Sequence, residues 1–346
     1  MSLISLLKGL GERAPWQSAA RPILLATGFD IRKGLPKTLE AAERLKDTAD
    51  QEAELSRFLI EHAVAGEKLI QLVKVSEQER KDVAKWVAAR RRSSHDLGAI
   101  FPGILEADDA EDFFDVAPVP CGNVDLEQGS AAFYSAVRAH HERVTVPQSL
   151  LKPGVTQSYQ KIIGIKRTLR QTHEAIWVPP TGKVIGVAVD LPRGYPKAFA
   201  DLSLEFLRGR LRKSLGRPLE FYNLWHAVDG LYAQKGDGKL VDYGFSVGGR
   251  SVNHHKLRRN GECLRVAVYD AAGAAAVGND LQLFKIALRW QVQHRDGSVS
   301  EPELLLPGTA IHLNQANAVI DQFILRDART SFDLNFVINK LLPHAR

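Results

Sequence analysis

The chain has 346 residues, of which 45% are hydrophobic and 25% charged, and its formal net charge is +6 at pH 7. These values lie near the averages for soluble globular proteins, so they exclude collagen-like, intrinsically disordered and disulfide-scaffold proteins. The length allows one large domain or two ordinary ones.

The two cysteines, Cys121 and Cys263, lie far apart and lack neighbours that would complete a zinc site or a disulfide framework, which predicts a reducing compartment. The N-terminus does not have the pattern of a secretory signal. The most apolar stretches are shorter than the roughly 18–20 residues that span a bilayer. We therefore expect a cytoplasmic protein with no membrane partner. Arg outnumbers Lys by 27 to 19 and Ala is abundant, which suggests a bacterial gene.

The charge is distributed unevenly along the chain. Residues 1–150 carry 19 Lys and Arg against 23 Asp and Glu, a net charge of −4, whereas residues 151–346 carry 27 against 17, a net charge of +10. A strongly basic region attracts polyanions, nucleic acid first. The alternative is a protein whose excess charge only keeps it dispersed.

The N-terminal region is predicted to be helical. Residues 38–64 lack Gly and Pro and are rich in Ala, Glu, Leu and Arg, which favours a long helix. A short helix is expected over residues 67–73. Ser76 then precedes Glu79 by three residues, the spacing of a capping box, and so predicts another helix. That helix ends in three arginines, residues 90–92, which suit the negative end of the helix dipole or could contact phosphate.

The following segment contains six acidic residues in the ten positions 106–115. It lacks the Gly and the closing Glu of a calcium loop, so we interpret it as a solvated helix start or a linker. Residues 118–122 are expected to form a loop and residues 130–142 a helix. Pro and Gly punctuate residues 146–154 like a linker, so we predict a domain boundary at residue 150.

Beyond the boundary the pattern changes to strands. Residues 172–178 and 183–191 flank the turn sequence at 179–182 and predict a β-hairpin. The remaining expected strands cover residues 159–165, 239–247, 281–292 and 303–306, and the expected helices cover 197–215, 219–233, 315–326 and 332–342. Hairpins followed by helices predict an α+β fold, in which a helical N-terminal region precedes a largely antiparallel sheet domain packed with helices.

Basic side chains gather in two places in the C-terminal region. One group lies on the helix over residues 197–215, and the other follows a Gly-Gly turn after the strand 239–247. Arg suits phosphate because its planar fork donates two parallel hydrogen bonds. Lys161, Lys166, Arg167 and Arg170 add charge on the first strand and its exit. The predicted nucleic-acid-binding residues are Arg210, Lys213, Arg217, Arg250, His254, His255, Lys256, Arg258 and Arg259.

Signatures of common enzymes are missing. The sequence has no Walker A loop, dinucleotide-binding glycine pattern, zinc-protease helix, Gly-x-Ser-x-Gly or Cys-x-x-Cys. Glu174 and Asp190 lie near the open end of the predicted hairpin, where they could hold a divalent ion together with His173 or His255. This is the one catalytic constellation that can be built, and it would use Mg²⁺ or Mn²⁺.

These observations predict a nucleic-acid-binding protein that contacts the phosphate backbone through its basic C-terminal domain, with little sequence specificity and no cofactor. A non-enzyme is favoured. One alternative is a metal-dependent nuclease or phosphodiesterase. The other is a non-enzymatic subunit of a bacterial antiviral-defence or mobile-element complex, in which residues 1–150 would mediate protein contacts or self-association.

Overall fold

A computed structural model describes residues 2–29, 31–105, 109–114, 116–152, 154, 159, 161–248, 251–258 and 261–346. Within them, the α-helices are α1 (Leu3–Arg13), α2 (Arg21–Ala26), α3 (Leu35–Ala42), α4 (Ala49–Ala65), α5 (Glu77–Ala88), α6 (Asp96–Ala99), α8 (Ala198–Leu215), α9 (Trp225–Ala233), α10 (Val268–Val277) and α11 (Ser331–Leu341). The strands are β1 (Lys68–Lys74), β2 (Val119–Asp125), β3 (Ser130–Thr145), β4 (Ile163–Val178), β5 (Val184–Asp190), β6 (Lys239–Val247), β7 (Ser251–Lys256), β8 (Leu281–Arg289), β9 (Val292–Gln293), β10 (Val299–Ser300), β11 (Glu303–Leu306) and β12 (Phe323–Arg326).

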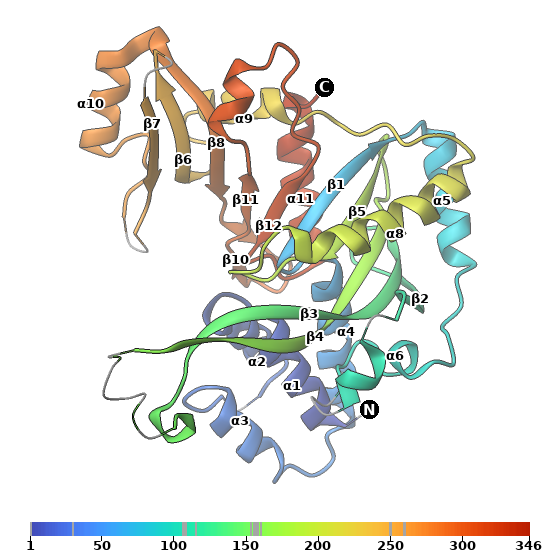
Figure 1. The fold of residues 1–346 in the computed structure, drawn as a ribbon. Helices are drawn as coiled ribbons and strands as arrows, with labels where there is room; N and C mark the ends of the chain where they lie inside the picture. The colour runs from blue at the N-terminus through green and yellow to red at the C-terminus, as the bar shows by residue number, and fades with distance from the viewer. Residues whose placement is uncertain are drawn as a thin grey trace.

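The centre of the fold is a ten-stranded sheet in the order β2-β3-β4-β5-β1-β12-β11-β8-β6-β7 (Figure 1). Every neighbouring pair in it is antiparallel. The strands β9 and β10 form a separate hairpin. Helices α1 to α4 precede the first strand. The predicted α+β fold with a largely antiparallel sheet is therefore confirmed.

Helices cover both faces of the sheet. On one face, α5 and α8 pack on β3, β4 and β5 around a buried cluster that includes Leu204, Leu207 and Leu211. On the other face, α4, α9 and α11 bury a larger cluster that includes Trp177 and Phe323. The N-terminal helices α1 and α2 form a third cluster with α4. This burial of apolar surface is the main stabilising contribution to the fold.

Several local predictions are confirmed. Ser76 and Glu79 form a capping box at the start of α5, because the Ser76 hydroxyl accepts the N–H of Glu79 and the Glu79 carboxylate accepts the N–H of Ser76. The strands β4 and β5 form the expected hairpin, and Gly182 in its turn has a φ of 97°. Helix α8 and the strands β6 and β11 lie where the sequence predicts them.

Four local predictions are wrong. Residues 67–73 and 130–142 were expected to be helical, but they form the strands β1 and β3. Residues 118–122 belong mainly to the strand β2 instead of a loop, and residues 315–326 end in the strand β12 instead of forming a helix. β1, β3 and β12 each gain a neighbouring strand that is distant in sequence, whereas β2 pairs with β3 across the short connection 126–129. In each case strand pairing outweighs the local propensity of the segment.

Two further helices differ from their expected extents. The helix expected over residues 38–64 is divided into α3 and α4 by residues 43–48, and the one expected from residue 219 begins at Trp225. The sheet takes β1, β2 and β3 from before residue 150 and its other seven strands from after it. The division into a region 1–150 and a region 151–346 stays a prediction. Among the helices of the described residues, none has both the length and the apolar character to cross a membrane.

Candidate nucleic-acid interface

The strands β3 and β4 extend beyond the rest of the sheet. They pair along their whole length, from Ser130 opposite Val178 to Thr145 opposite Ile163. In contrast, β2 pairs with β3 only as far as Ser135, and β5 pairs with β4 only over residues 175–177. Residues 138–145 and 163–170 therefore form a two-stranded ribbon, about 27 Å long at about 3.4 Å per residue. Figure 1 shows this ribbon, in green, running out to the left of the view.

The ribbon and its connecting segment are strongly basic. Between residues 139 and 170 the sequence has six Lys and Arg and a single acid, Glu142. Arg143, Lys152, Lys161 and Lys166 are exposed, and no carboxylate of a described residue forms an ion pair with them. These four side chains, which we call the ribbon cations, are thus available to an external anion.

The register of β3 and β4 places charged groups on both faces of the ribbon. Arg143 lies opposite Ile165, and Lys166 lies opposite Glu142 in the next pair. Because successive residues of a strand point to opposite faces, Arg143 and Lys166 project to opposite sides. The face with Arg143 also carries Ile163 and Ile165, whose side chains are 55% and 74% exposed.

The base of the ribbon is fixed on both faces. On one face Leu169 packs in a small apolar cluster with Val137, and Arg167 pairs with Glu111 at 2.8 Å. On the other face the His140 ring stacks on Tyr195, with 3.8 Å between the ring centroids. The described part of the ribbon therefore has an anchored base and an exposed outer half.

The acidic segment is placed against this base. Its described residues include the 3-10 helix Asp109–Phe113, from which Glu111 reaches Arg167, and the Arg167 guanidinium lies 4.3 Å from the centre of the Phe114 ring. Residues 106–108 and 115 lie outside the described residues. The described part of the segment neutralises one cation of the ribbon, Arg167, and forms no ion pair with any of the four ribbon cations.

The predicted cations of α8 have different environments. Arg217, just after the helix, donates to both carboxylate oxygens of Glu79 at 2.6 and 3.2 Å and to the carbonyl of Lys74 at 2.9 Å. It therefore holds α8 against α5. The Arg210 guanidinium lies 5.1 Å from the centre of the Phe206 ring. Arg210 and Lys213 are exposed.

The second predicted group lies on and after the edge strand β7. His254 packs edge-on against Phe284, and Lys256 and Arg258 are exposed. His255 forms a short contact through Nδ1 with the carboxylate of Asp270 on α10, which also accepts from the Tyr243 hydroxyl at 2.8 Å. Arg250 and Arg259 lie outside the described residues.

The structure does not bring these two groups together. Helix α8 packs on β5, and five strands stand between β5 and β7 in the sheet. At about 4.8 Å per strand step, the separation is of the order of 29 Å. Each group is therefore a separate surface.

The two candidate catalytic carboxylates lie on opposite faces of the sheet. Glu174 accepts from the hydroxyls of Thr172 and Ser203, on the face that α8 covers, and is buried. Asp190 lies on the other face, beside Lys68. His255 is on the distant strand β7. Among the described residues no group of three or more His, Cys, Asp or Glu could hold a metal ion.

Asp190 instead belongs to a buried ion network. It accepts from Lys68 Nζ at 2.6 Å, from the Arg13 guanidinium at 3.0 and 3.2 Å, and from the backbone N–H of His173 at 2.7 Å. Burial opposes ionisation of Asp190, but the charges of Arg13 and Lys68 outweigh it and hold the pKa of Asp190 well below its ordinary value. Burial lowers the pKa of His62 to about 4 and that of His173 well below its ordinary value. The network therefore keeps the Asp190 carboxylate ionised and the side chains of His62 and His173 neutral.

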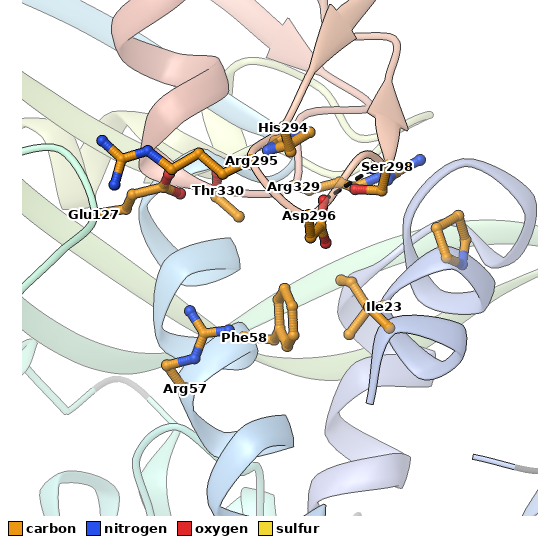
Figure 2. Close-up of a pocket in the computed structure, with 12 residues that line it drawn as sticks. Ile23, Arg57, Phe58, Glu127, His294, Arg295, Asp296, Ser298, Arg329 and Thr330 are labelled. Carbon is orange, nitrogen blue, oxygen red and sulfur yellow. Dashed lines mark hydrogen bonds between the residues drawn. The ribbon is translucent and has the colours of Figure 1, made fainter. Parts of the chain in front are cut away.

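A pocket of about 160 Å³ lies between α2, α4 and the β9–β10 turn. Figure 2 shows Ile23 and Phe58 on one side of it, with Asp296 facing them. Two of the arginines that line the pocket already interact with other groups of the protein. Arg57 pairs with Glu54 at 2.6 Å, and Arg329 donates to the carbonyls of Ser18 and Val299. We assign no ligand to this pocket.

Sequence reasoning missed the ribbon because it interpreted residues 130–142 as a helix. It recognised basic residues at 161–170 but had no partner strand for them. The signal that could have found it is the clustering of β-branched residues at 144–146 and 162–165 on either side of Pro147–Pro153, which favours two strands joined by a loop.

Comparisons of the chain with protein-family models, with curated proteins and with solved structures found no match.

Proposed function

We propose that the protein binds nucleic acid through phosphate contacts made by the β3–β4 ribbon. The observation that carries this proposal is the set of four exposed ribbon cations with no carboxylate partner among the described residues. Cations without partners release counterions from a polyanion when they bind it, and this release drives association.

The proposal predicts a steep dependence on salt. Four phosphate contacts give a slope of about −3.6 in log K against log salt on duplex DNA, so affinity falls by roughly two orders of magnitude between 50 and 200 mM salt. Sequence should matter little to this part of the affinity, because phosphates carry no sequence information.

The test is a fluorescence-anisotropy titration of labelled DNA at several salt concentrations. The ribbon variant combines Arg143→Ala, Lys161→Ala and Lys166→Ala, and we expect its salt slope to be smaller by about 3. The control combines Lys81→Ala, Lys85→Ala and Lys235→Ala, which removes the same charge from exposed sites elsewhere. Equal affinities for the ribbon variant and the control would refute the proposal.

A third variant tests the surface predicted from the sequence. Arg210→Ala with Lys213→Ala removes the two exposed cations of α8 that were predicted to bind nucleic acid, and it leaves Arg212 in place. If this variant loses affinity while the ribbon variant keeps it, the interface lies on α8 and the ribbon proposal fails.

The other predictions have less support. A metal-dependent nuclease would need carboxylates in one place, and Glu174 and Asp190 lie on opposite faces of the sheet. Adding Mg²⁺ or Mn²⁺ to the binding reactions and analysing the DNA and RNA on a gel tests for cleavage. The role as a subunit of a defence or mobile-element complex, the self-association through residues 1–150 and the cytoplasmic location stay predictions.

A further inference from the structure

We propose that the β3–β4 ribbon enters the major groove of B-form DNA, where Ile163 and Ile165 contact the methyl groups of thymine. The inference rests on the proposed function and goes beyond it, because it names the form of nucleic acid and the part of the base that the ribbon meets.

The first argument is shape. The major groove of B-form DNA is about 12 Å wide and admits a two-stranded β-ribbon. Among the strands of the described residues, none lies beside the outer part of this ribbon as a third strand, because β2 and β5 stop pairing near its base. The major groove of an A-form RNA duplex is deep and too narrow for side chains to read. The ribbon therefore fits DNA better than double-stranded RNA.

The second argument is the position of the charges. Arg143 shares its face of the ribbon with Ile163 and Ile165, and it is exposed. A ribbon that turns this face toward the bases therefore also carries Arg143 into the groove. The phosphates on either side of the groove lie within reach of a long cationic side chain, so the charge and the two isoleucines favour the same orientation on a duplex.

The third argument is the pair of exposed isoleucines. Ile163 and Ile165 share a face with Arg143, and nothing in the described part of the chain covers them. Two neighbouring apolar side chains that face water gain free energy when a partner covers them. In the major groove the apolar group offered by a base pair is the C5-methyl group of thymine. The positive charge around these two residues favours a polyanion as the partner. On DNA, the thymine methyl group is the apolar group that their side chains can contact.

The experiment compares binding to four labelled nucleic acids of equal length by anisotropy. These are a thymine-containing DNA duplex, the same duplex with uracil in place of thymine, the corresponding single strand, and the corresponding RNA duplex. We expect the thymine duplex to bind at least tenfold tighter than the single strand or the RNA. Replacing thymine by uracil should weaken binding about fourfold for each methyl group that the isoleucines bury.

The variant Ile163→Ser with Ile165→Ser assigns this difference to the ribbon. Both side chains are exposed, so the variant should fold like the wild type, which circular dichroism checks. It should bind the thymine and uracil duplexes alike. The control is Val252→Ser, an equally β-branched residue that is 58% exposed on β7, and it should keep the difference.

The outcomes separate the inference from the proposed function. If the ribbon-cation variant binds like its control, the proposed function fails and the inference falls with it. If the ribbon cations are required but single strands or RNA duplexes bind as tightly as DNA duplexes, the proposed function stands and the inference is refuted. The same holds if the wild type does not distinguish thymine from uracil.

Discussion

Replacing Asp190 by Asn tests how strongly the buried ion network stabilises the fold. The Lys68 side chain is fully buried and that of Arg13 is 5% exposed, so neither can turn to water when its anion is removed. Asn keeps the shape of Asp and can still accept one hydrogen bond, but it leaves two buried cations uncompensated. Removing one partner of a buried ion pair costs about 3–5 kcal/mol, and we expect a loss of this size in the free energy of unfolding.

The assay is urea denaturation followed by tryptophan fluorescence, since Trp177 is fully buried. The matched control is Glu220→Gln, which makes the same chemical change in an exposed ion pair with Lys74 and should cost less than about 1 kcal/mol. Combining Asp190→Asn with Lys68→Met should cost less than the sum of the two single changes, because they act on one network. A loss below about 1 kcal/mol for Asp190→Asn would refute the reasoning.

The same network predicts a dependence on pH. The pKa of Asp190 is below its unfolded value of 3.8 because of Arg13 and Lys68, although burial opposes this. The folded state therefore binds fewer protons than the unfolded state. The stability from Asp190 is fully present above pH 3.8 and is lost as the pH falls below it. The Asn variant should not show this loss.

Three further predictions concern other parts of the chain. Burial lowers the pKa of His62 to about 4, so the fold should lose up to about 3 kcal/mol between pH 6.5 and pH 4, and His62→Gln should reduce that loss in urea titrations at pH 7 and 4.5. Ser76→Ala removes the hydroxyl that accepts the N–H of Glu79 and should lower the unfolding free energy by about 1 kcal/mol. A hydrogen bond that His294 donates to the Asp333 carboxylate raises the pKa of His294, so its contribution is present below pH 6.5 and is lost as the pH rises through the folded value. Asp333→Asn should move that pKa back down in an NMR titration.

The parts of the fold that the sequence predicts well depend on nearby residues. The capping box of α5 needs two side chains three positions apart, and the turn around Gly182 needs one residue that tolerates a positive φ. Such interactions are complete within a few residues. The parts that failed depend on distant partners. Residues 68–74 form a strand because β5 and β12 flank them on both sides, and no local pattern contains that information.

The candidate site shows the same limit. The basic residues at 161–170 were recognised from their type, but their meaning depends on β3. Four Ala residues between 131 and 139 favour a helix locally, so residues 130–142 were interpreted as one. Glu174 and Asp190 were expected to be close because their strands are neighbours, and the strands are indeed paired. Their separation follows from the register of β4 and β5, which pairs Ala175 with Ala188 and so puts Glu174 and Asp190 on opposite faces of the sheet. The register cannot be read from one sequence when both faces of a strand are buried.

The ion network also accounts for one edge of the ribbon, the point at which β5 stops pairing with β4. A strand continues its ladder as long as the next backbone N–H and C=O find partners on the neighbouring strand. At His173 the backbone N–H donates to the side chain of Asp190, and the backbone C=O accepts from the side chain of Lys68 at 2.6 Å. Both groups are therefore satisfied by side chains, so β5 need not follow β4 any further and the pairing between the two strands ends at Ala175. The outer half of β4 remains paired with β3 alone, and it is this departure that carries the cations of residues 143–166 away from the body of the protein.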